Sequence, residues 1–191
     1  MSQKTTQAAR VSAWNLPNAI TLARILLVPY FVWLYLNPAP EGLLAPWWAV
    51  AVFTLAIATD GLDGAIARSR GLVTNLGKIL DPIADKALIG AALILLSLEG
   101  RVLWVATALI LIREIGMTVF RLAIIRHRVI GASGGGKLKT VLQAITVGLL
   151  LSPIDLLLTW VAPIEQMLLW LVVLITVVTG VQYLVAVRKA S

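Results

Sequence analysis

The sequence predicts an all-α membrane protein with six transmembrane helices. Of its 191 residues, 60% are hydrophobic, and the mean hydropathy is +0.94. Soluble domains are closer to half apolar. Six apolar runs are each long enough to cross about 30 Å of hydrocarbon as a helix of about 20 residues. These runs lie at about 19–36, 43–59, 79–98, 102–125, 141–162 and 164–187.

The N-terminal region divides into a polar arm and the start of the first span. Residues 1–13 are polar, so we expect a cytoplasmic arm or surface helix and no signal peptide, followed by one membrane domain over 14–191. Asn18 is an expected helix N-cap. However, Asn18, Thr21 and Arg24 recur at every third position, on one helix face near the membrane surface. These residues either help to start the helix or bind a ligand, and the sequence alone supports both interpretations.

The distribution of basic residues predicts the orientation. The net charge is +7, and thirteen Lys and Arg residues fall on one side if the N-terminus is cytoplasmic. Arg101 alone falls in an opposite loop, while loops 37–46 and 152–163 contain acids and no base. The positive-inside rule therefore predicts that both termini are cytoplasmic. The same distribution favours a membrane over nucleic acid as the partner of the positive charge.

Four of the nine acidic residues lie between positions 60 and 85. Asp60 and Asp63 are three residues apart, and Asp81 and Asp85 are four apart, so on helices each pair shares a face. Carboxylates are costly at membrane depth and are therefore expected to be functional. Converging carboxylates repel one another unless cations compensate them. Oxygen ligands of this density suit Mg²⁺ first and Mn²⁺ second, usually with a phosphate-bearing substrate.

Small residues accompany the carboxylates. Gly64 lies four residues after the first aspartate and Gly77 four before the third, and a backbone without Cβ lets a bulky ligand approach closely. We expect a cytoplasmic turn over residues 69–76 between the two helices. Pro82 either kinks the third helix or marks its first turn.

The fourth apolar run contains three charged residues, Arg113, Glu114 and Arg121. Adjacent helical residues do not share a face, so we expect Arg113 and Glu114 to have different partners. One interpretation is that both are satisfied by partners within the bundle. Arg113 and Arg121 are eight residues apart and do share a face. A basic face of this kind suits a phosphate, since Arg presents a bidentate fork to phosphate oxygens. Residues 126–139 are predicted to be the most basic loop.

The carboxylates, glycines and one arginine form a known signature. The run Asp60-x2-Asp63-Gly64-x2-Ala67-Arg68-x8-Gly77-x3-Asp81-x3-Asp85 resembles that of the CDP-alcohol phosphotransferases at every specified position. The resemblance implies six transmembrane helices, a homodimer and two divalent ions. It also implies transfer of a phosphatidyl group from CDP-diacylglycerol to an alcohol, with release of CMP.

Three further stretches resemble the branch of this family that makes phosphatidylglycerophosphate in phospholipid synthesis. They are Asn15-Leu16-Pro17-Asn18 to Arg24, Arg113-Glu114-Ile115 and Gly136-Lys137-Leu138-Lys139-Thr140. Glycerol 3-phosphate is therefore the leading acceptor, and inositol phosphate, serine and phosphatidylglycerol are alternatives. We expect the enzyme in a bacterial cytoplasmic membrane with its active site facing the cytoplasm. A cation transporter, in which carboxylates bind the permeating ion, is the alternative from another class.

The resemblance assigns roles to individual residues. Asp60, Asp63 and Asp81 are expected to hold two Mg²⁺ or Mn²⁺ ions, with Asp85 completing the second site and acting as general base. The residues expected to bind CDP-diacylglycerol are Asn18, Thr21, Asp60, Gly64, Ala67, Arg68, Thr74 and Gly77. Those expected to bind the acceptor phosphate are Arg113, Arg121, Lys137 and Lys139. For the two lysines the alternative is anchorage to anionic lipid headgroups.

Overall fold

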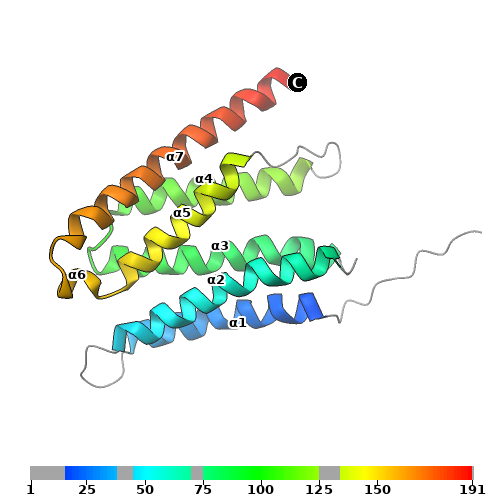
Figure 1. Cartoon of the computed structure of the whole chain (residues 1–191). Helices are drawn as coiled ribbons and strands as arrows, with labels where there is room; N and C mark the ends of the chain where they lie inside the picture. The colour runs from blue at the N-terminus through cyan, green and yellow to red at the C-terminus, as the bar shows by residue number, and fades with distance from the viewer. Residues whose placement is uncertain (1–15, 38–44, 70–74, 125–133, 191) are drawn as a thin grey trace, which may run out of the picture.

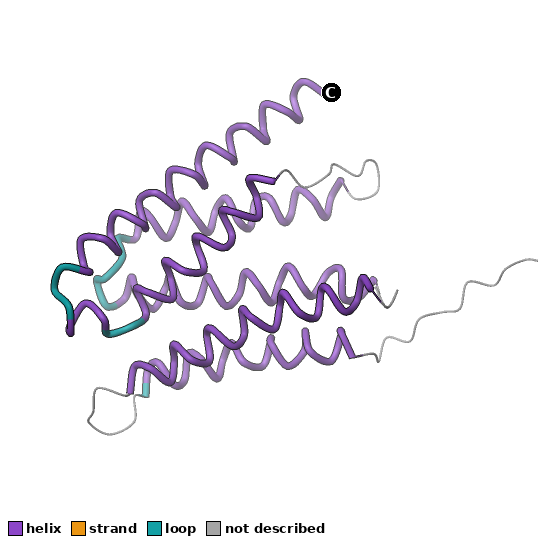
Figure 2. The backbone as a smooth tube through the Cα atoms, viewed as in Figure 1, coloured by secondary structure: helices purple, strands orange, loops and turns teal. Residues whose placement is uncertain are grey.

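The computed structural model describes residues 16–37, 45–69, 75–124 and 134–190, which contain helices and turns but no strand (Figures 1 and 2). Side chains at several helix ends, including 60–69, 75–79 and 134–137, lie outside this description. The helices are α1 (Leu16–Leu36), α2 (Ala45–Ser69), α3 (Asn75–Leu98), α4 (Trp104–Ile124), α5 (Gly134–Leu151), α6 (Ile154–Leu157) and α7 (Val161–Ala190).

The long helices run alternately up and down, which brings distant sequence segments to the same end of the bundle. The start of α1, the end of α2 and the start of α3 lie at one end, together with the end of α4 and the start of α5 (Figure 1). Helix α1 packs on α2 and α3, while α5 contacts α2, α3 and α7. Helix α4 packs between α3 and α7. The helix ends that carry the aspartates therefore lie together.

The described helices pack around an apolar core that includes Phe31, Phe53 and Leu96, but they also expose large apolar side chains and bury charged ones. Large apolar side chains are exposed, including Ile112 at 71% and Leu156 at 78%. Charged side chains are buried, including Arg24 at 1% and Glu114 at 5%. An apolar exterior of this extent is suited to lipid, and buried ionisable groups are what a membrane bundle keeps in its interior.

Two helices among the described residues are long and apolar enough to cross a membrane. These segments are Ala19–Leu36 and Val161–Tyr183, and shorter apolar segments cover Trp47–Thr59 and Leu138–Leu151. Together with the exposed apolar surface, they give the all-α architecture of a membrane protein. The all-α part of the predicted fold class is thus confirmed for the described residues, and the six-span topology stays a prediction.

Helix boundaries agree with the sequence in some places and correct it in others. Helix α2 runs without a break to Ser69 and α3 begins at Asn75, as the expected turn over 69–76 requires. Pro82 lies inside α3, so it does not mark the first turn. Helix α1 begins at Leu16, so Asn18 lies within its first turn and is not the N-cap.

The fifth helix differs most from the prediction. The apolar run 141–162 suggested a helix over those residues, preceded by a basic loop to residue 139. Helix α5 instead begins at Gly134 and ends at Leu151, before Ser152 and Pro153. Three glycines cost about 1 kcal/mol each relative to alanine within a helix, so tertiary packing of α5 overrides their local preference. Proline then lacks the N–H needed to continue the helical hydrogen bonds.

A tight turn joins α3 to α4 at the end of the bundle that carries α6. Gly100 has a φ of +75°, a left-handed conformation that glycine adopts without steric penalty. The turn is closed by the Arg101 N–H, which donates to the Leu96 carbonyl at 2.9 Å. Nearby, the hydroxyls of Ser97 and Thr107 are hydrogen-bonded at 2.7 Å and tie the two helices together.

Arg101 connects this turn to α6 and α7 through a group of residues that we call the Arg101 cluster. Its members are Arg101, Ser152, Asp155, Glu165 and Gln166. Arg101 Nη2 lies 2.8 Å from Asp155 Oδ2 and 3.7 Å from Glu165 Oε2. The Gln166 amide donates to the Arg101 carbonyl at 2.9 Å, and the guanidinium approaches the Ser152 carbonyl at 3.4 Å. Glu165 is 2% exposed, and within the described part of the chain Arg101 is its ion-pair partner.

Replacing Arg101 by alanine is expected to destabilise the protein by about 3 kcal/mol, the low end for breaking a buried ion pair, because Arg101 is 25% exposed. Two carboxylates would then face each other without a cation. For a chain of this size, thermal unfolding in detergent should fall by about 6–12 °C. Arg101→Lys, which keeps the charge, should recover part of the loss. A melting temperature within 1–2 °C of wild type for Arg101→Ala would contradict this role.

Candidate active site

The aspartates predicted to bind metal lie on two helices that pack against each other. Asp60 and Asp63 lie on the last turns of α2, and Asp81 and Asp85 on the first half of α3. Of the four, the structure describes only the side chain of Asp85, which is 23% exposed. Within the described side chains no group of three or more potential metal ligands occurs. The backbone nevertheless brings both helical segments to one end of the bundle (Figure 1).

The predicted substrate-binding residues are described to different extents. Thr21 lies on α1 and is 2% exposed. Thr74 lies outside the described residues. For the others only a helix position is described, without the side chain; they are Asn18 on α1, Gly64, Ala67 and Arg68 on α2, Gly77 on α3, Arg121 on α4 and Lys137 on α5.

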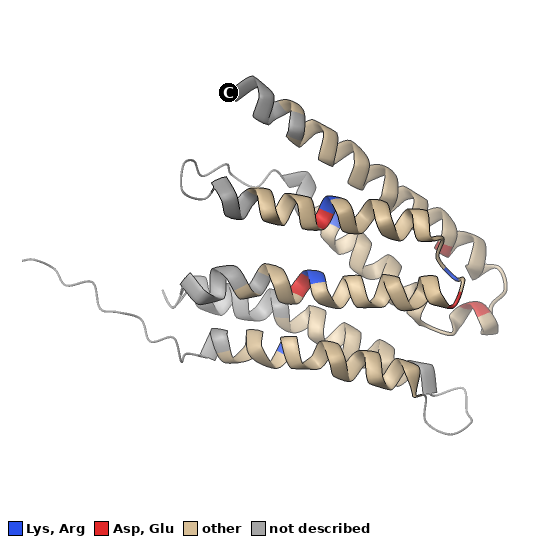
Figure 3. Cartoon of the chain, turned by 180° about the vertical axis from the view of Figure 1, so that it is seen from behind, with Lys and Arg blue, Asp and Glu red and all other residues tan. Residues whose placement is uncertain are grey.

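Glu114 of α4 is the centre of a charged network inside the bundle, which we call the Glu114 cluster. Its members are Asp85, Lys86, Arg113, Glu114 and Lys139. Glu114 Oε2 lies 3.0 Å from Lys86 Nζ, and Oε1 accepts from Arg113 Nη1 at 3.0 Å. Lys139 also donates to Oε1. Among the described charges, this cluster lies partway along α3 and α4 and the Arg101 cluster lies at the end with α6, while Arg24 lies on α1 (Figure 3).

Lys86 links the cluster to the predicted catalytic aspartate. Its Nζ lies 2.6 Å from Asp85 Oδ2 and 3.0 Å from Glu114 Oε2, so one ammonium bridges the two carboxylates. Charge-assisted contacts of this length are among the stronger hydrogen bonds in proteins. The arrangement ties α3 to α4 at the residue expected to remove the acceptor's proton.

Arg113 is oriented by two helices. Its Nη1 donates to Glu114, and its Nη2 donates to the Thr179 hydroxyl of α7 at 3.1 Å. The expectation that Arg113 and Glu114 have different partners is confirmed in part, because Thr179 contacts Arg113 and two lysines contact Glu114. The long arginine side chain also folds back to its neighbour's carboxylate, which the expectation did not include. Gly180 makes room for it, since a Cβ there would lie 3.3 Å from Arg113 Cγ.

The position of Lys139 bears on the two roles considered for it. It lies on α5, not in a loop, and is 3% exposed. A lysine that is almost fully buried and paired with Glu114 does not reach lipid headgroups from this position. Headgroup anchorage is therefore not supported for Lys139, whereas the side chain of Lys137 lies outside the described residues.

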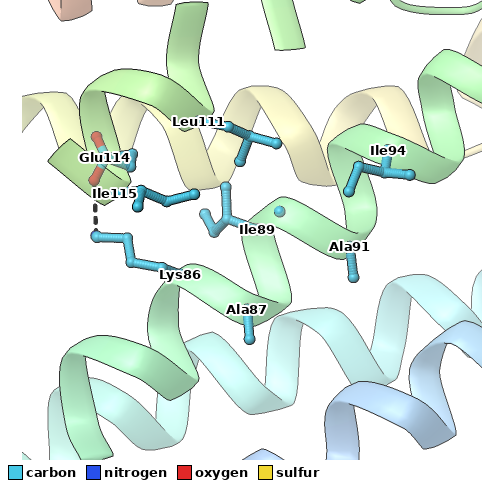
Figure 4. A pocket seen from close by; sticks show the side chains of 9 residues that line it. Lys86, Ala87, Ile89, Ala91, Ile94, Leu111, Glu114 and Ile115 are labelled. Atoms are coloured by element: carbon cyan, nitrogen blue, oxygen red, sulfur yellow. Dashed lines mark ion pairs between the residues drawn. The ribbon is translucent and has the colours of Figure 1, made fainter. Parts of the chain in front are cut away.

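A cavity of about 330 Å³ lies between α3 and α4 beside the cluster. Lys86 and Glu114 form its polar part, and the rest is lined by apolar residues such as Ile89, Leu111 and Ile115 (Figure 4). Figure 4 shows the Lys86–Glu114 ion pair at one side of this space. In the described part of the site, a cluster of positively charged side chains therefore lies next to a largely apolar cavity.

Sequence reasoning did not assign Lys86, Glu114 or Thr179 to the site. Glu114 had a usable signal, since it is the one acid in the apolar run 102–125 and such acids are costly in a membrane. Lys86 adjoins Asp85, but its contact with α4 depends on how two helices are rotated. Thr179 had no signal, because threonine is common in membrane helices.

The fold and site define a helical bundle with an apolar exterior, in which the helix segments that carry the aspartates lie at one end and a cluster of positively charged side chains lies partway along α3 and α4. The chain belongs to the CDP-alcohol phosphatidyltransferase family, whose pattern matches residues 14–178, and it is accordingly a transferase.

Several bacterial relatives have closely similar sequences. A probable phosphatidylglycerophosphate synthase of Mycobacterium tuberculosis (strain ATCC 25618 / H37Rv) is 45% identical over 179 residues, covering 92% of this chain and 83% of the relative. The CDP-diacylglycerol–glycerol-3-phosphate 3-phosphatidyltransferase of Bacillus subtilis (strain 168) is 40% identical over 184 residues, with coverages of 89% and 93%. An enzyme of the same name from Rickettsia bellii (strain RML369-C) is 36% identical over 178 residues, with coverages of 92% and 96%.

Proposed function

We propose that this enzyme transfers a phosphatidyl group from CDP-diacylglycerol to sn-glycerol 3-phosphate, giving phosphatidylglycerophosphate and CMP in phospholipid synthesis. The names of the relatives support this substrate pair. The structural observation that carries the proposal is the Glu114 cluster, in which Lys86, Arg113 and Lys139 meet beside Asp85. An anionic acceptor suits this surplus of positive charge. Family membership leaves the cation-transporter alternative without support.

Asp85 is the general base of the proposed reaction. It takes the proton from the acceptor hydroxyl as that oxygen attacks the phosphorus bonded to diacylglycerol. A new phosphorus–oxygen bond forms, the bond to the CMP phosphate breaks, and CMP leaves with its electron pair. The transfer is direct, so no covalent enzyme intermediate forms. Lys86, 2.6 Å from Asp85 Oδ2, orients the carboxylate.

The donor set fits divalent cations, because aspartate oxygens are the hard ligands that Mg²⁺ and Mn²⁺ prefer. Asp60, Asp63 and Asp81 would hold two such ions, with Asp85 completing the second site. When bound, the ions would offset the charge of the diphosphate. The side chain of Asp85 is partly exposed, and Asp85 lies on the same helix as Asp81. A metal ligand needs both an accessible oxygen and neighbouring ligands.

The substrates are proposed to approach from opposite sides of Asp85. The cytidine diphosphate would lie along the α2 segment with Gly64, Ala67 and Arg68, near Gly77 and the α1 residues Asn18 and Thr21, and next to Thr74. Small residues allow a nucleotide to lie flat against a helix. The acceptor phosphate would be received by Arg113 and Lys139 of the cluster, together with Arg121 and Lys137.

We further propose a six-span topology with both termini cytoplasmic, in a bacterial cytoplasmic membrane. The five long helices other than α5 have 21–30 residues, or about 31–45 Å, and α5 has 18, or about 27 Å. Each therefore approaches or exceeds the roughly 30 Å hydrocarbon thickness. The active site would face the cytoplasm, and the family resemblance favours a homodimer.

The substrate assignment is tested by acceptor competition on purified enzyme. With CDP-diacylglycerol in detergent micelles, CMP release is expected with sn-glycerol 3-phosphate and not with serine, myo-inositol phosphate or phosphatidylglycerol. The measurement is CMP formed, with the lipid product identified by mass. CMP release with one of the other alcohols, and none with glycerol 3-phosphate, would overturn the acceptor while leaving the transferase chemistry in place.

A further inference from the structure

We infer that Glu114 is a positioning residue that fixes the acceptor-binding cations relative to Asp85, an inference that rests on the proposed function. Glu114 is 5% exposed and uses both carboxylate oxygens. Oε1 accepts from Arg113 and Lys139, and Oε2 pairs with Lys86. Cations from α3, α4 and α5 thus converge on one carboxylate. It binds no substrate itself but determines where its three partners lie.

The charge balance explains why an acid is needed at this point. Lys86, Arg113 and Lys139 bring three positive charges, and Asp85 and Glu114 bring two negative ones, which leaves one net positive charge. Without Glu114 the three cations would repel one another in a poorly solvated interior. With it they stay together, and the remaining positive charge still attracts a phosphate.

The contacts around Glu114 set directions as well as charge. Arg113 is held on its other side by Thr179, 3.1 Å away, and fits against Gly180. Lys86 is shared with Asp85 at 2.6 Å. The ammonium group of Lys86 therefore links Glu114 to Asp85, the proposed base. A shift of the Glu114 carboxylate would move the phosphate-binding cations and also Lys86, the ion-pair partner of Asp85. Groups held in this way reduce the reorganisation needed when the acceptor binds.

Two other roles for Glu114 give different experimental results. If it only stabilised the bundle, its loss would lower the melting temperature and leave the Michaelis constants unchanged. If it competed with the acceptor phosphate for the cations, its neutralisation would lower the Michaelis constant for glycerol 3-phosphate. A positioning role predicts that this constant rises while that for CDP-diacylglycerol stays near wild type.

The test compares Glu114→Gln and Glu114→Asp with a matched control, Glu165→Gln. Glu165 is also buried, at 2% exposed against 5% for Glu114, and contacts an arginine, but it lies in the Arg101 cluster, away from the proposed site. Mutation of groups that orient metal ligands typically costs about 10- to 100-fold in affinity, and we expect a rise of this size in the Michaelis constant for glycerol 3-phosphate with Glu114→Gln. Glu114→Asp should give a smaller rise, and Glu165→Gln should lower only the melting temperature.

Unchanged or lower Michaelis constants for glycerol 3-phosphate in the Glu114 variants would overturn the inference. If Glu114→Gln does not fold, the Glu114→Asp measurement decides in the same way. Failure of the proposed function is recognised separately, because wild-type enzyme would then show no CMP release with glycerol 3-phosphate. In that case the readout is the rise in melting temperature that inorganic phosphate gives. A smaller rise in Glu114→Asp than in the wild type and in Glu165→Gln still supports the positioning role. An equal rise in all three proteins overturns it.

Discussion

Asp85→Asn is expected to lower kcat by about 10²- to 10⁴-fold, the usual contribution of a general base, while CDP-diacylglycerol still binds. The amide keeps the size of the side chain but cannot accept the acceptor's proton. It also removes the 2.6 Å ion pair with Lys86, and the ammonium keeps its ion pair with Glu114. The measurement is single-turnover CMP release, with donor binding followed by equilibrium dialysis in detergent.

Asp155→Asn provides the matched control. Asp155 is 20% exposed, against 23% for Asp85, and its Oδ2 lies 2.8 Å from Arg101, so both substitutions remove one partner of a half-buried ion pair. Only the Asp85 variant should lose turnover, since Asp155 lies in the Arg101 cluster. Near-normal turnover by Asp85→Asn would remove it as the base. A trapped phosphatidyl–enzyme adduct would instead contradict direct transfer.

The sequence was sufficient to place the four aspartates on two consecutive helices. The aspartate pairs of α2 and α3, and the short connection between these helices, follow from i, i+3 and i, i+4 periodicity and from an interruption in the apolar pattern. The excess of apolar residues likewise predicts an all-α membrane protein without reference to tertiary structure.

The Glu114 cluster could not be predicted in the same way. Lys139 falls within the predicted basic loop 126–139, whereas α5, which packs against α2, α3 and α7, extends back to Gly134. Whether Lys86 faces α4 depends on the rotation of α3 about its axis, which residue spacing alone does not fix. Long Lys and Arg side chains add further uncertainty, since Arg113 reaches its own neighbour and a threonine of α7.

The Arg101 cluster shows a related effect on topology. A lone arginine on the opposite side from the other basic residues is an exception to the positive-inside pattern. In the structure it is neutralised by Asp155 and lies near the buried Glu165, both distant in sequence. Arg101 therefore forms ion pairs where the α3–α4 turn packs on α6 and α7. Because its charge is neutralised there, its position is compatible with the proposed orientation.

Removing divalent cations is expected to abolish transfer completely, and Asp63→Ala to do so at every Mg²⁺ or Mn²⁺ concentration. Four carboxylates on the facing ends of α2 and α3 repel one another unless cations compensate them. Wild-type activity lost in excess chelator should return on adding Mg²⁺ or Mn²⁺. The measurement is CMP release from CDP-diacylglycerol with glycerol 3-phosphate as acceptor.

Stability offers a readout of the same site that does not depend on turnover. A ligand that binds only the folded state at 100 times its dissociation constant stabilises it by about 2.7 kcal/mol, so Mg²⁺ should raise the melting temperature of the wild type. Asp63→Ala should lose most of this rise, because one ligand and part of the negative charge are gone. Asp155→Ala, which removes a carboxylate from the Arg101 cluster, should retain it. Full activity in excess chelator, or the same rise in all three proteins, would contradict a metal site on the α2 and α3 aspartates.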